Sequence, residues 1–194
     1  MKLAAARRRF DEHGPCERFR LSQGRIEDDT MNRHSEDFES GFKIAYVEAG
    51  WHQDILAPGR EAFARRMQGK GLDGSRIDYF TVPGAFEIPL FARRLAASGR
   101  YAAIAGAAFV VDGGMYRHDF VASTVVDALM RVQLDENVPV FSMVLTPHHF
   151  HEHATHLQFF KDHFSIKGSE LAEACMQQLL GLEALDRYRV ETLT

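Results

Sequence analysis

The chain has 194 residues, of which 45 % are hydrophobic and 26 % are charged, a composition typical of one ordinary globular domain. Its formal net charge of −4 gives no general reason to expect a nucleic-acid partner, and no apolar run is long enough to cross a membrane. The two cysteines form neither a metal-binding spacing nor a disulfide framework. We therefore expect a cytoplasmic protein without nucleic-acid or membrane partners.

Residues 1–40 differ from the rest of the chain. They contain the runs Arg7-Arg8-Arg9 and Glu27-Asp28-Asp29 and show no sustained hydrophobic period. This composition predicts a poorly ordered extension, and the acidic residues disfavour a basic arm for nucleic acid or membranes. We expect the folded domain at residues 41–194, with Met31 as a candidate translation start.

From residue 42 onward, patterns of buried strands alternate with helical patterns. Alternation of this kind is typical of βαβ units, in which helices cover both faces of a parallel sheet. The sequence therefore predicts one α/β domain with three layers, αβα, around a mainly parallel sheet. Helical spacing also predicts that Leu90, Phe91 and Leu95 face the core. The expected strands are 42–47, 77–82, 103–111 and 138–145; the expected helices are 54–68, 86–97, 121–134 and 166–185, the last preceded by a polar, histidine-rich segment at 148–164.

The strand at 103–111 leads into a candidate site. It ends at Asp112-Gly113-Gly114, and the polar run Arg117-His118-Asp119 precedes the next helix. Adjacent glycines allow a ligand to approach the backbone, and a helix N-terminus favours an anion. Arginine adds a fixed positive charge and histidine a group that titrates near neutrality. The pattern favours an anion site over a plain turn with solvated polar residues.

Other strand exits carry candidates too, because the exit loops of a parallel sheet share one edge. Trp51 follows the first strand as either a platform for a planar ring or a rim residue packed on the domain or on a neighbour. Glu87 follows the second strand. It is either a first-turn acid of its helix or an acceptor for a polyhydroxylated ligand, with the Ala85 backbone beside it.

Histidines gather after the fourth strand. A zinc site needs three or four converging ligands, and the chain contains no HExxH motif. We therefore expect no metal and place one or two of these histidines in an anion pocket. The cluster comprises His148, His149, His151, His153, His156 and His163.

Four strings in this order and spacing carry a family resemblance: VPGAFEIP, GAAFVVDGGMYRHDFV, VPVFSMVLT and IKG. Over residues 42–182 the chain resembles the lumazine synthases, and in particular their type II branch. The resemblance implies a flavodoxin-like fold. It also implies the condensation of 5-amino-6-(D-ribitylamino)uracil with 3,4-dihydroxy-2-butanone 4-phosphate to 6,7-dimethyl-8-ribityllumazine, the penultimate step of riboflavin synthesis, with no cofactor.

The resemblance also implies roles for individual residues. Trp51 matches the position that stacks an aromatic ring on the pyrimidine. His156 stands where the family holds the substrate phosphate with an arginine, and with Ser142 it would serve the pocket of a neighbouring subunit. The remaining substrate-binding positions implied by the resemblance are Ala85, Phe86, Glu87, Phe109, Val110 and Val111 for the ribityl chain and ring, and Gly114 and Met115 for the phosphate.

The catalytic position is ambiguous between two neighbours. The gapless match places Arg117 where the family has its catalytic histidine, and His118 follows one step later. An arginine cannot act as a base at neutral pH, so its role there would be electrostatic. The register favours Arg117 facing the pocket, with His118 as the alternative proton carrier.

The resemblance further implies a homo-oligomer, with two pentamers packed into a decamer rather than a large shell. Two functions remain open. The first is the synthase reaction on its two small-molecule substrates. The second, slightly favoured by Arg117 at the catalytic position, is a low-activity protein that stores or senses flavin or lumazine on the same fold.

Overall fold

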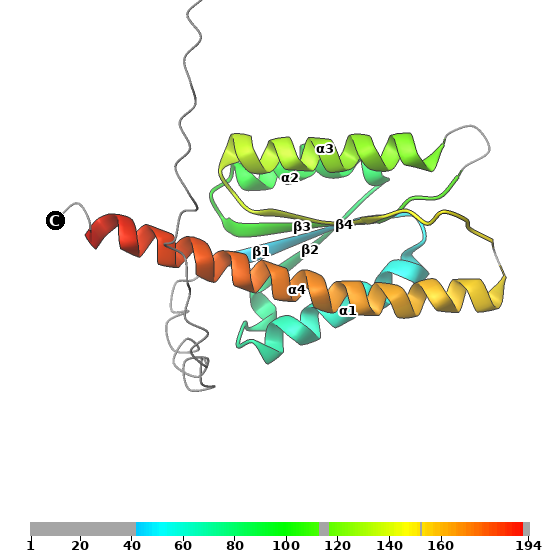
Figure 1. Ribbon diagram of the computed structural model, residues 1–194, viewed down its shortest axis with the longest axis horizontal. Coiled ribbons are helices and arrows are strands. Elements are labelled where there is room, and N and C mark those ends of the chain that lie inside the picture. Colours follow the sequence, from blue (N-terminus) through cyan, green and yellow to red (C-terminus); the bar gives the residue numbers. More distant parts are fainter. Residues whose placement is uncertain (1–41, 113–116, 152, 192–194) are drawn as a thin grey trace, which may run out of the picture. The chain divides into compact units, whose positions relative to one another are not determined.

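The computed structural model describes residues 42–112, 117–151 and 153–191 (Figure 1). The extension expected at residues 1–40 lies outside the described residues. The same holds for Gly114 and Met115, which were expected to bind phosphate.

The described residues form one sheet of four strands, all parallel, in the order β2-β1-β3-β4. The central strand β1 pairs Ile44 with Ile77 of β2 on one side and with Ala103 of β3 on the other. The predicted parallel sheet is thereby confirmed. The strands are β1 (Lys43–Ala49), β2 (Ile77–Val82), β3 (Tyr101–Phe109) and β4 (Val140–Leu145).

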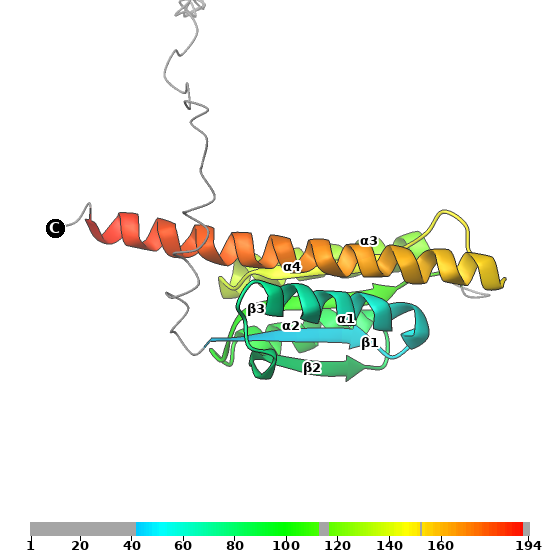
Figure 2. The ribbon, with the colours of Figure 1, turned by 90° about the horizontal axis from the view of Figure 1, so that it is seen from below.

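Helices cover both faces of the sheet, as predicted. Helices α1 and α4 lie on one face, and α2 and α3 lie on the other (Figures 1 and 2). None of the described helices is long and apolar enough to cross a membrane. The helices are α1 (Gln53–Gly69), α2 (Ile88–Ala96), α3 (His118–Glu136) and α4 (Ala154–Glu191), with short 3₁₀ turns η1 (Gly74–Arg76) and η2 (Ala85–Glu87).

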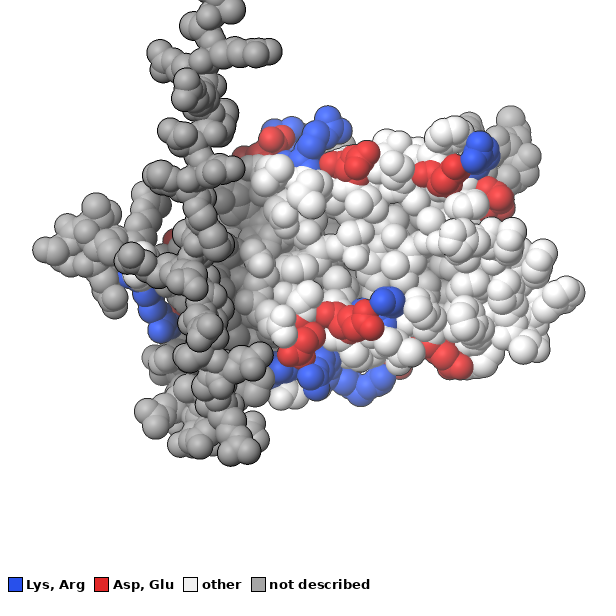
Figure 3. All heavy atoms as spheres, viewed as in Figure 1, with Lys and Arg blue, Asp and Glu red and all other residues white. Residues whose placement is uncertain are grey.

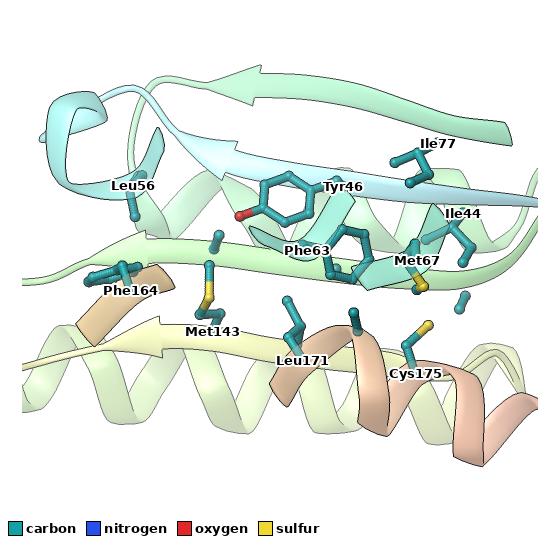
Figure 4. Close-up of a cluster of buried hydrophobic side chains, with 14 of the residues drawn as sticks. Ile44, Tyr46, Leu56, Phe63, Met67, Ile77, Met143, Phe164, Leu171 and Cys175 are labelled. Atoms are coloured by element: carbon teal, nitrogen blue, oxygen red, sulfur yellow. The ribbon is translucent and has the colours of Figure 1, made fainter. Parts of the chain in front are cut away.

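The larger core lies between the sheet and the α1/α4 layer (Figure 4). Tyr46 of β1 packs on Phe63 of α1, with ring centroids 5.2 Å apart. Phe164 and Cys175 enter the same core from α4 and are fully buried. Burial raises the pKa of the Cys175 thiol to about 12, so this side chain acts as a small hydrophobic residue.

The second core lies under α2 and α3, and here one sequence prediction was wrong. Leu90 was expected to face the core, yet its side chain is 65 % exposed. The buried positions of α2 are Ile88, Ala92 and Ala96. Phe91 and Leu95 pack, partly buried, against this core as expected, so Leu90 lies beside the inward stripe rather than on it. The chain also makes the 3₁₀ turn η2 first, so the helix starts two residues later than expected.

The last helix is much longer than the sequence pattern suggested. The polar segment expected at 148–164 and the helix expected at 166–185 form, from Ala154 onward, one helix of 38 residues. Its first turns are amphipathic, because Phe160 and Phe164 lie four residues apart and both are buried against the sheet. The histidines of that segment lie at other positions than these two phenylalanines. Because the histidines are numerous, the apolar stripe of the helix was not recognised in the sequence.

Two glycines bring α1 and α4 into close contact. A Cβ atom built on Gly168 would lie 2.0 Å from the carbonyl oxygen of Gly59, so only glycine fits at this crossing. Gly59 in turn lies against Phe164 and Met143. The crossing gives a physical reason for the glycine of the IKG string.

Candidate active site

The loops that leave the four strands lie at one edge of the sheet, as predicted, and hydrogen bonds tie them together. The backbone N–H of Gly50, after β1, donates to the carbonyl of Val82 at the end of β2 (2.7 Å). The Thr146 hydroxyl, after β4, donates to the carbonyl of Val110 after β3 (2.7 Å). These bonds join the exits of β1 and β2 to each other, and those of β3 and β4 to each other.

A cavity of about 230 Å³ opens at the β3–β4 part of this edge. One wall comes from the end of β3 and the start of α3, and the other comes from the loop after β4. The lining residues are Val111, Asp112, His118, Pro147, His148, His149, Phe150 and His151.

Asp112 holds His118 in a defined orientation. One carboxylate oxygen, Oδ1, accepts a hydrogen bond from the backbone N–H of His118 (2.9 Å) and lies 2.8 Å from its Nδ1. The backbone hydrogen bond, followed by the one to the ring, lowers the pKa of Asp112, so the carboxylate is ionised and accepts only. Nδ1 of His118 must then carry a proton, which leaves Nε2 as the basic nitrogen of the neutral ring.

Arg117 does not line this cavity of the single chain. Its guanidinium pairs with Asp119 (2.7 Å) and lies over the ring of Phe120, 5.1 Å from the centroid. His118, not Arg117, is among the described residues that line the cavity. Arg117 precedes the helix with extended backbone, whereas His118 is the first helical residue and is held by Asp112, so their side chains diverge.

His156 supports the loop after β4 and does not line the cavity. Its Nδ1 accepts the backbone N–H of His151 (3.1 Å), and its ring lies 4.7 Å from that of Phe160. The histidines on the cavity wall are instead His148, His149 and His151. Their place directly after a strand was the available sequence signal. Among the described residues, no group of three or more His, Cys, Asp or Glu side chains is placed to hold a metal ion.

Aromatic rings support the loop after β4. Phe150 of this loop packs edge-on against Phe109 of β3 and His52 of the β1 exit, with centroids 5.3 Å and 5.7 Å away. Phe109 is only 5 % exposed. Its ring is thus part of the packing, so only its backbone is available to a ligand.

Trp51 and η2 form the other part of the edge. Trp51 lies in the turn between β1 and α1 with 72 % of its surface exposed, which excludes packing on its own domain. Phe86 and Glu87 of η2 are exposed as well. The indole of Trp51 is therefore accessible from outside the chain.

Ser142 lies at a different place from the loops. It is an exposed residue within β4, at the edge of the sheet, and its hydroxyl accepts the backbone N–H of Val144 (3.2 Å). An edge strand is accessible from outside the subunit, so this position is compatible with a role toward a neighbouring pocket.

Glu48 is a buried charge that the sequence did not reveal. It lies just beyond the strand expected at 42–47 but belongs to β1, where it is 3 % exposed and paired with Arg60 of α1. Burial raises its pKa, and Arg60 acts against that shift. This pair joins the end of β1 to α1 on either side of the turn that carries Trp51.

Comparison with known proteins agrees with this arrangement. The family model described as 6,7-dimethyl-8-ribityllumazine synthase matches residues 41–182. A protein of that name from Rhodococcus erythropolis is 56 % identical over 145 residues, covering 75 % of this chain and 94 % of the relative. A "6,7-dimethyl-8-ribityllumazine synthase 2" from Pseudomonas syringae pv. tomato is 55 % identical over 145 residues, covering 75 % of this chain and 85 % of the relative.

The matched range contains every described loop of the carboxyl edge, including both walls of the cavity. A third relative, a "6,7-dimethyl-8-ribityllumazine synthase 2" from Bradyrhizobium diazoefficiens, is 54 % identical over 143 residues, which is 74 % of this chain and 86 % of the relative. The chain belongs to the 6,7-dimethyl-8-ribityllumazine synthase family, and it is therefore an enzyme, a transferase.

Proposed function

We propose that this chain condenses 5-amino-6-(D-ribitylamino)uracil with 3,4-dihydroxy-2-butanone 4-phosphate to 6,7-dimethyl-8-ribityllumazine and inorganic phosphate. The observation that carries the proposal is the family match over residues 41–182, which spans the whole carboxyl edge of the sheet. The test is steady-state formation of the lumazine from the two purified substrates. A rate no higher than that without protein contradicts the proposal.

The reaction requires little chemistry from the side chains. An amine attacks a carbonyl and forms a Schiff base with loss of water, phosphate leaves, and the ring closes with loss of a second water. Holding two substrates in the reactive geometry supplies about 7–11 kcal/mol in the best intramolecular cases. A positioned proton carrier adds about 10²–10⁴-fold. No cofactor is needed for these steps.

His118 is the proton carrier in this proposal. Asp112 fixes its Nδ1–H, so Nε2 is available to take a proton from the attacking amine and to return it to a leaving oxygen. Arg117 cannot act as a base. We assign it an electrostatic contribution to the charge around the phosphorylated substrate, with Asp119 and Phe120 holding its side chain.

The ring and ribityl chain bind at the β1–β2 part of the edge. Trp51 stacks on the pyrimidine, and η2 faces the ribityl chain with Ala85, Phe86 and Glu87. The segment 109–111 completes this side, with the backbone of Phe109 rather than its buried ring. The high exposure of Trp51 and Phe86 supports this assignment.

Assembly is part of the proposal. We place Ser142 and His156 in the pocket of a neighbouring subunit, within pentamers that pair to decamers, and we place the enzyme in the cytoplasm with its biosynthetic substrates. Exposed apolar side chains on the α2/α3 layer, among them Leu90 and Leu134, support contact with other copies. The alternative of storing or sensing a flavin is not favoured, because the relatives are named as synthases.

A further inference from the structure

His52, which directly follows Trp51, has a backbone conformation that is uncommon outside glycine. It is left-handed, with φ 55° and ψ 38°. Its carbonyl oxygen accepts the backbone N–H of Ile55 (2.9 Å) and of Leu56 (3.1 Å), so α1 starts from this residue. Glycine adopts the same conformation at lower cost. The backbone alone therefore does not explain a histidine here, and the side chain has to be considered.

The imidazole ring of His52 joins an aromatic cluster formed by two other segments. It packs edge-on against Phe109 of β3, with ring centroids 5.6 Å apart, and against Phe150 of the loop after β4, at 5.7 Å. The rings of Phe109 and Phe150 pack edge-on against each other as well, at 5.3 Å. Figure 3 shows mainly uncharged side chains, on the face drawn there, at the end of the molecule where α4 begins. Ring packing therefore connects the turn after β1 to the loop after β4.

The cluster continues from Phe150 to the first turn of α4. The ring of His156 stacks on that of Phe150 (6.4 Å between centroids, 25° between planes), and its Nδ1 accepts the backbone N–H of His151 in the same loop (3.1 Å). One set of packed rings therefore runs from the residue after Trp51 to His156. In the proposed function, Trp51 stacks on the pyrimidine in its own pocket. His156 lies in the pocket of a neighbouring subunit, where its sequence position implies contact with the phosphate.

We infer that His52 is a positioning residue, whose ring fixes Trp51 and the loop after β4 in place relative to each other. The inference rests on the proposed function. A group that positions a substrate can lose up to about 10²-fold of its effect when it is displaced by about 1 Å. Each ring pair contributes only a modest free energy, so loss of the His52 ring should loosen both segments rather than unfold the domain. His52 need not touch either substrate for this role.

Matched variants separate the effect of the ring from that of the backbone. His52→Asn removes the imidazole, yet asparagine also adopts the left-handed conformation. His52→Phe restores an aromatic ring at the same position. The control is Asn137→Gly, a change at the other non-glycine residue with positive φ among the described residues, which lies after α3 and ahead of β4.

The first measurement is the fluorescence anisotropy of Trp51, the only tryptophan of the chain, in the assembled full-length protein without ligand. It should fall in His52→Asn, because the indole moves more freely, and keep the wild-type value in His52→Phe and Asn137→Gly. Riboflavin is then titrated by quenching of the same fluorescence. It should bind His52→Asn about three- to tenfold more weakly, the range for one or two lost ring contacts.

The second measurement is steady-state kinetics with both substrates. His52→Asn should raise KM for the ribitylaminouracil and for the phosphorylated substrate alike, each by about three- to tenfold, because both segments loosen. The value of kcat should stay close to that of the wild type, because Asp112 still holds His118. His52→Phe should restore both KM values. If His52→Asn does not assemble, Phe150→Leu, which removes a partner ring, gives the same comparison of anisotropy and KM.

Wild-type anisotropy or riboflavin affinity in His52→Asn, a rise in only one of the two KM values, or failure of His52→Phe to restore them overturns the inference. These outcomes are separable from the proposed function. Anisotropy needs neither substrate nor turnover, so it reports on the turn even if no lumazine forms. Conversely, lumazine formation by His52→Asn with wild-type KM values rejects the positioning role and leaves the synthase function intact.

Discussion

Arg117 and His118 are adjacent in the chain, yet their surroundings assign them different chemistry. His118 is 23 % exposed at its side chain and fixed by Asp112, whereas the guanidinium of Arg117 is 70 % exposed and paired with Asp119. Only the imidazole can exchange a proton at neutral pH. Of the two neighbours, only His118 lines the cavity.

Replacing the two neighbours separately tests this division. His118→Ala should lower kcat by at least about 10²-fold and remove the low-pH limb of the rate profile, because the proton carrier is lost. Arg117→Ala should mainly raise KM for the phosphorylated substrate, by less than about fivefold, since an exposed ion pair contributes at most about 1 kcal/mol. Steady-state kinetics over a range of pH measure both. A normal rate in His118→Ala with an inactive Arg117→Ala reverses the assignment.

Trp51 provides a second test at the residue scale. As the chain's only tryptophan, it should lose fluorescence when a flavin or lumazine stacks on its indole. Trp51→Ala should weaken ligand binding by about 1–3 kcal/mol, the range for an aromatic ring stacked on a base. Leu185→Ala, at an exposed apolar position of α4, should leave binding unchanged. Undiminished affinity in Trp51→Ala would mean that a neighbouring subunit covers the indole instead.

Among the elements, the crossing of α1 and α4 depends on glycine. Gly168→Ala forces a methyl group to within 2.0 Å of the Gly59 carbonyl oxygen, so the helices must separate. Overpacking of this kind costs about 1–3 kcal/mol of the free energy of unfolding, or more. Gly181→Ala is the control, because a methyl group there meets nothing within 4 Å. Chemical denaturation measures both; equal stability of Gly168→Ala and the wild type would show that the crossing can relax.

The amino ends of three strands are joined through one carboxylate. Asp78 of β2 accepts hydrogen bonds from Lys43 of β1 (2.9 Å) and Tyr101 of β3 (2.9 Å). The bond from Lys43, and then the one from Tyr101, hold the pKa of Asp78 below its usual value. Since the folded pKa is lower than the unfolded one, the carboxylate stabilises the fold above about pH 4, and this contribution is lost as pH falls through the folded pKa.

Asp78→Asn should therefore reduce the free energy of unfolding by about 1 kcal/mol at neutral pH, because the group is partly exposed. The difference from the wild type should shrink as the pH falls below about 4. Denaturation at a series of pH values measures it, with Glu183→Gln in an exposed pair of α4 as the control. A difference that stays constant down to acidic pH would exclude the charge as its cause.

At the scale of the whole molecule, the α2/α3 layer leaves large apolar side chains uncovered. Leu90 is 65 % exposed and Leu134 is 72 % exposed, and Phe120 and Met130 of α3 are exposed as well. A chain that folds alone rarely leaves so much apolar surface in water. We expect a mass near that of ten chains of 22.0 kDa, about 220 kDa, by light scattering at micromolar concentration. A monomeric mass would reject both the decamer and the pockets shared between subunits.

The sequence by itself determined the class and order of the fold. Strands and helices have different hydrophobic periods. The period can be read from neighbouring residues without knowing any tertiary contact. The strand 77–82 was predicted with its observed bounds, and the strand predicted at 103–111 lies two residues earlier, as β3. The strings around Pro83 and Asp112 indicated the family, because they combine turn residues and polar groups at a strand exit.

Tertiary contacts decided what the pattern left open. Helix α4 begins at Ala154 because Phe160 and Phe164 of its first turns pack against the sheet. This packing stabilises turns whose other residues are mostly polar. Glu48 is buried because Arg60 comes to it from another element. His118 reaches the cavity because the Asp112 carboxylate, six residues earlier, binds its backbone and its ring. Each outcome depends on a partner brought close by folding, and no local period encodes such a partner.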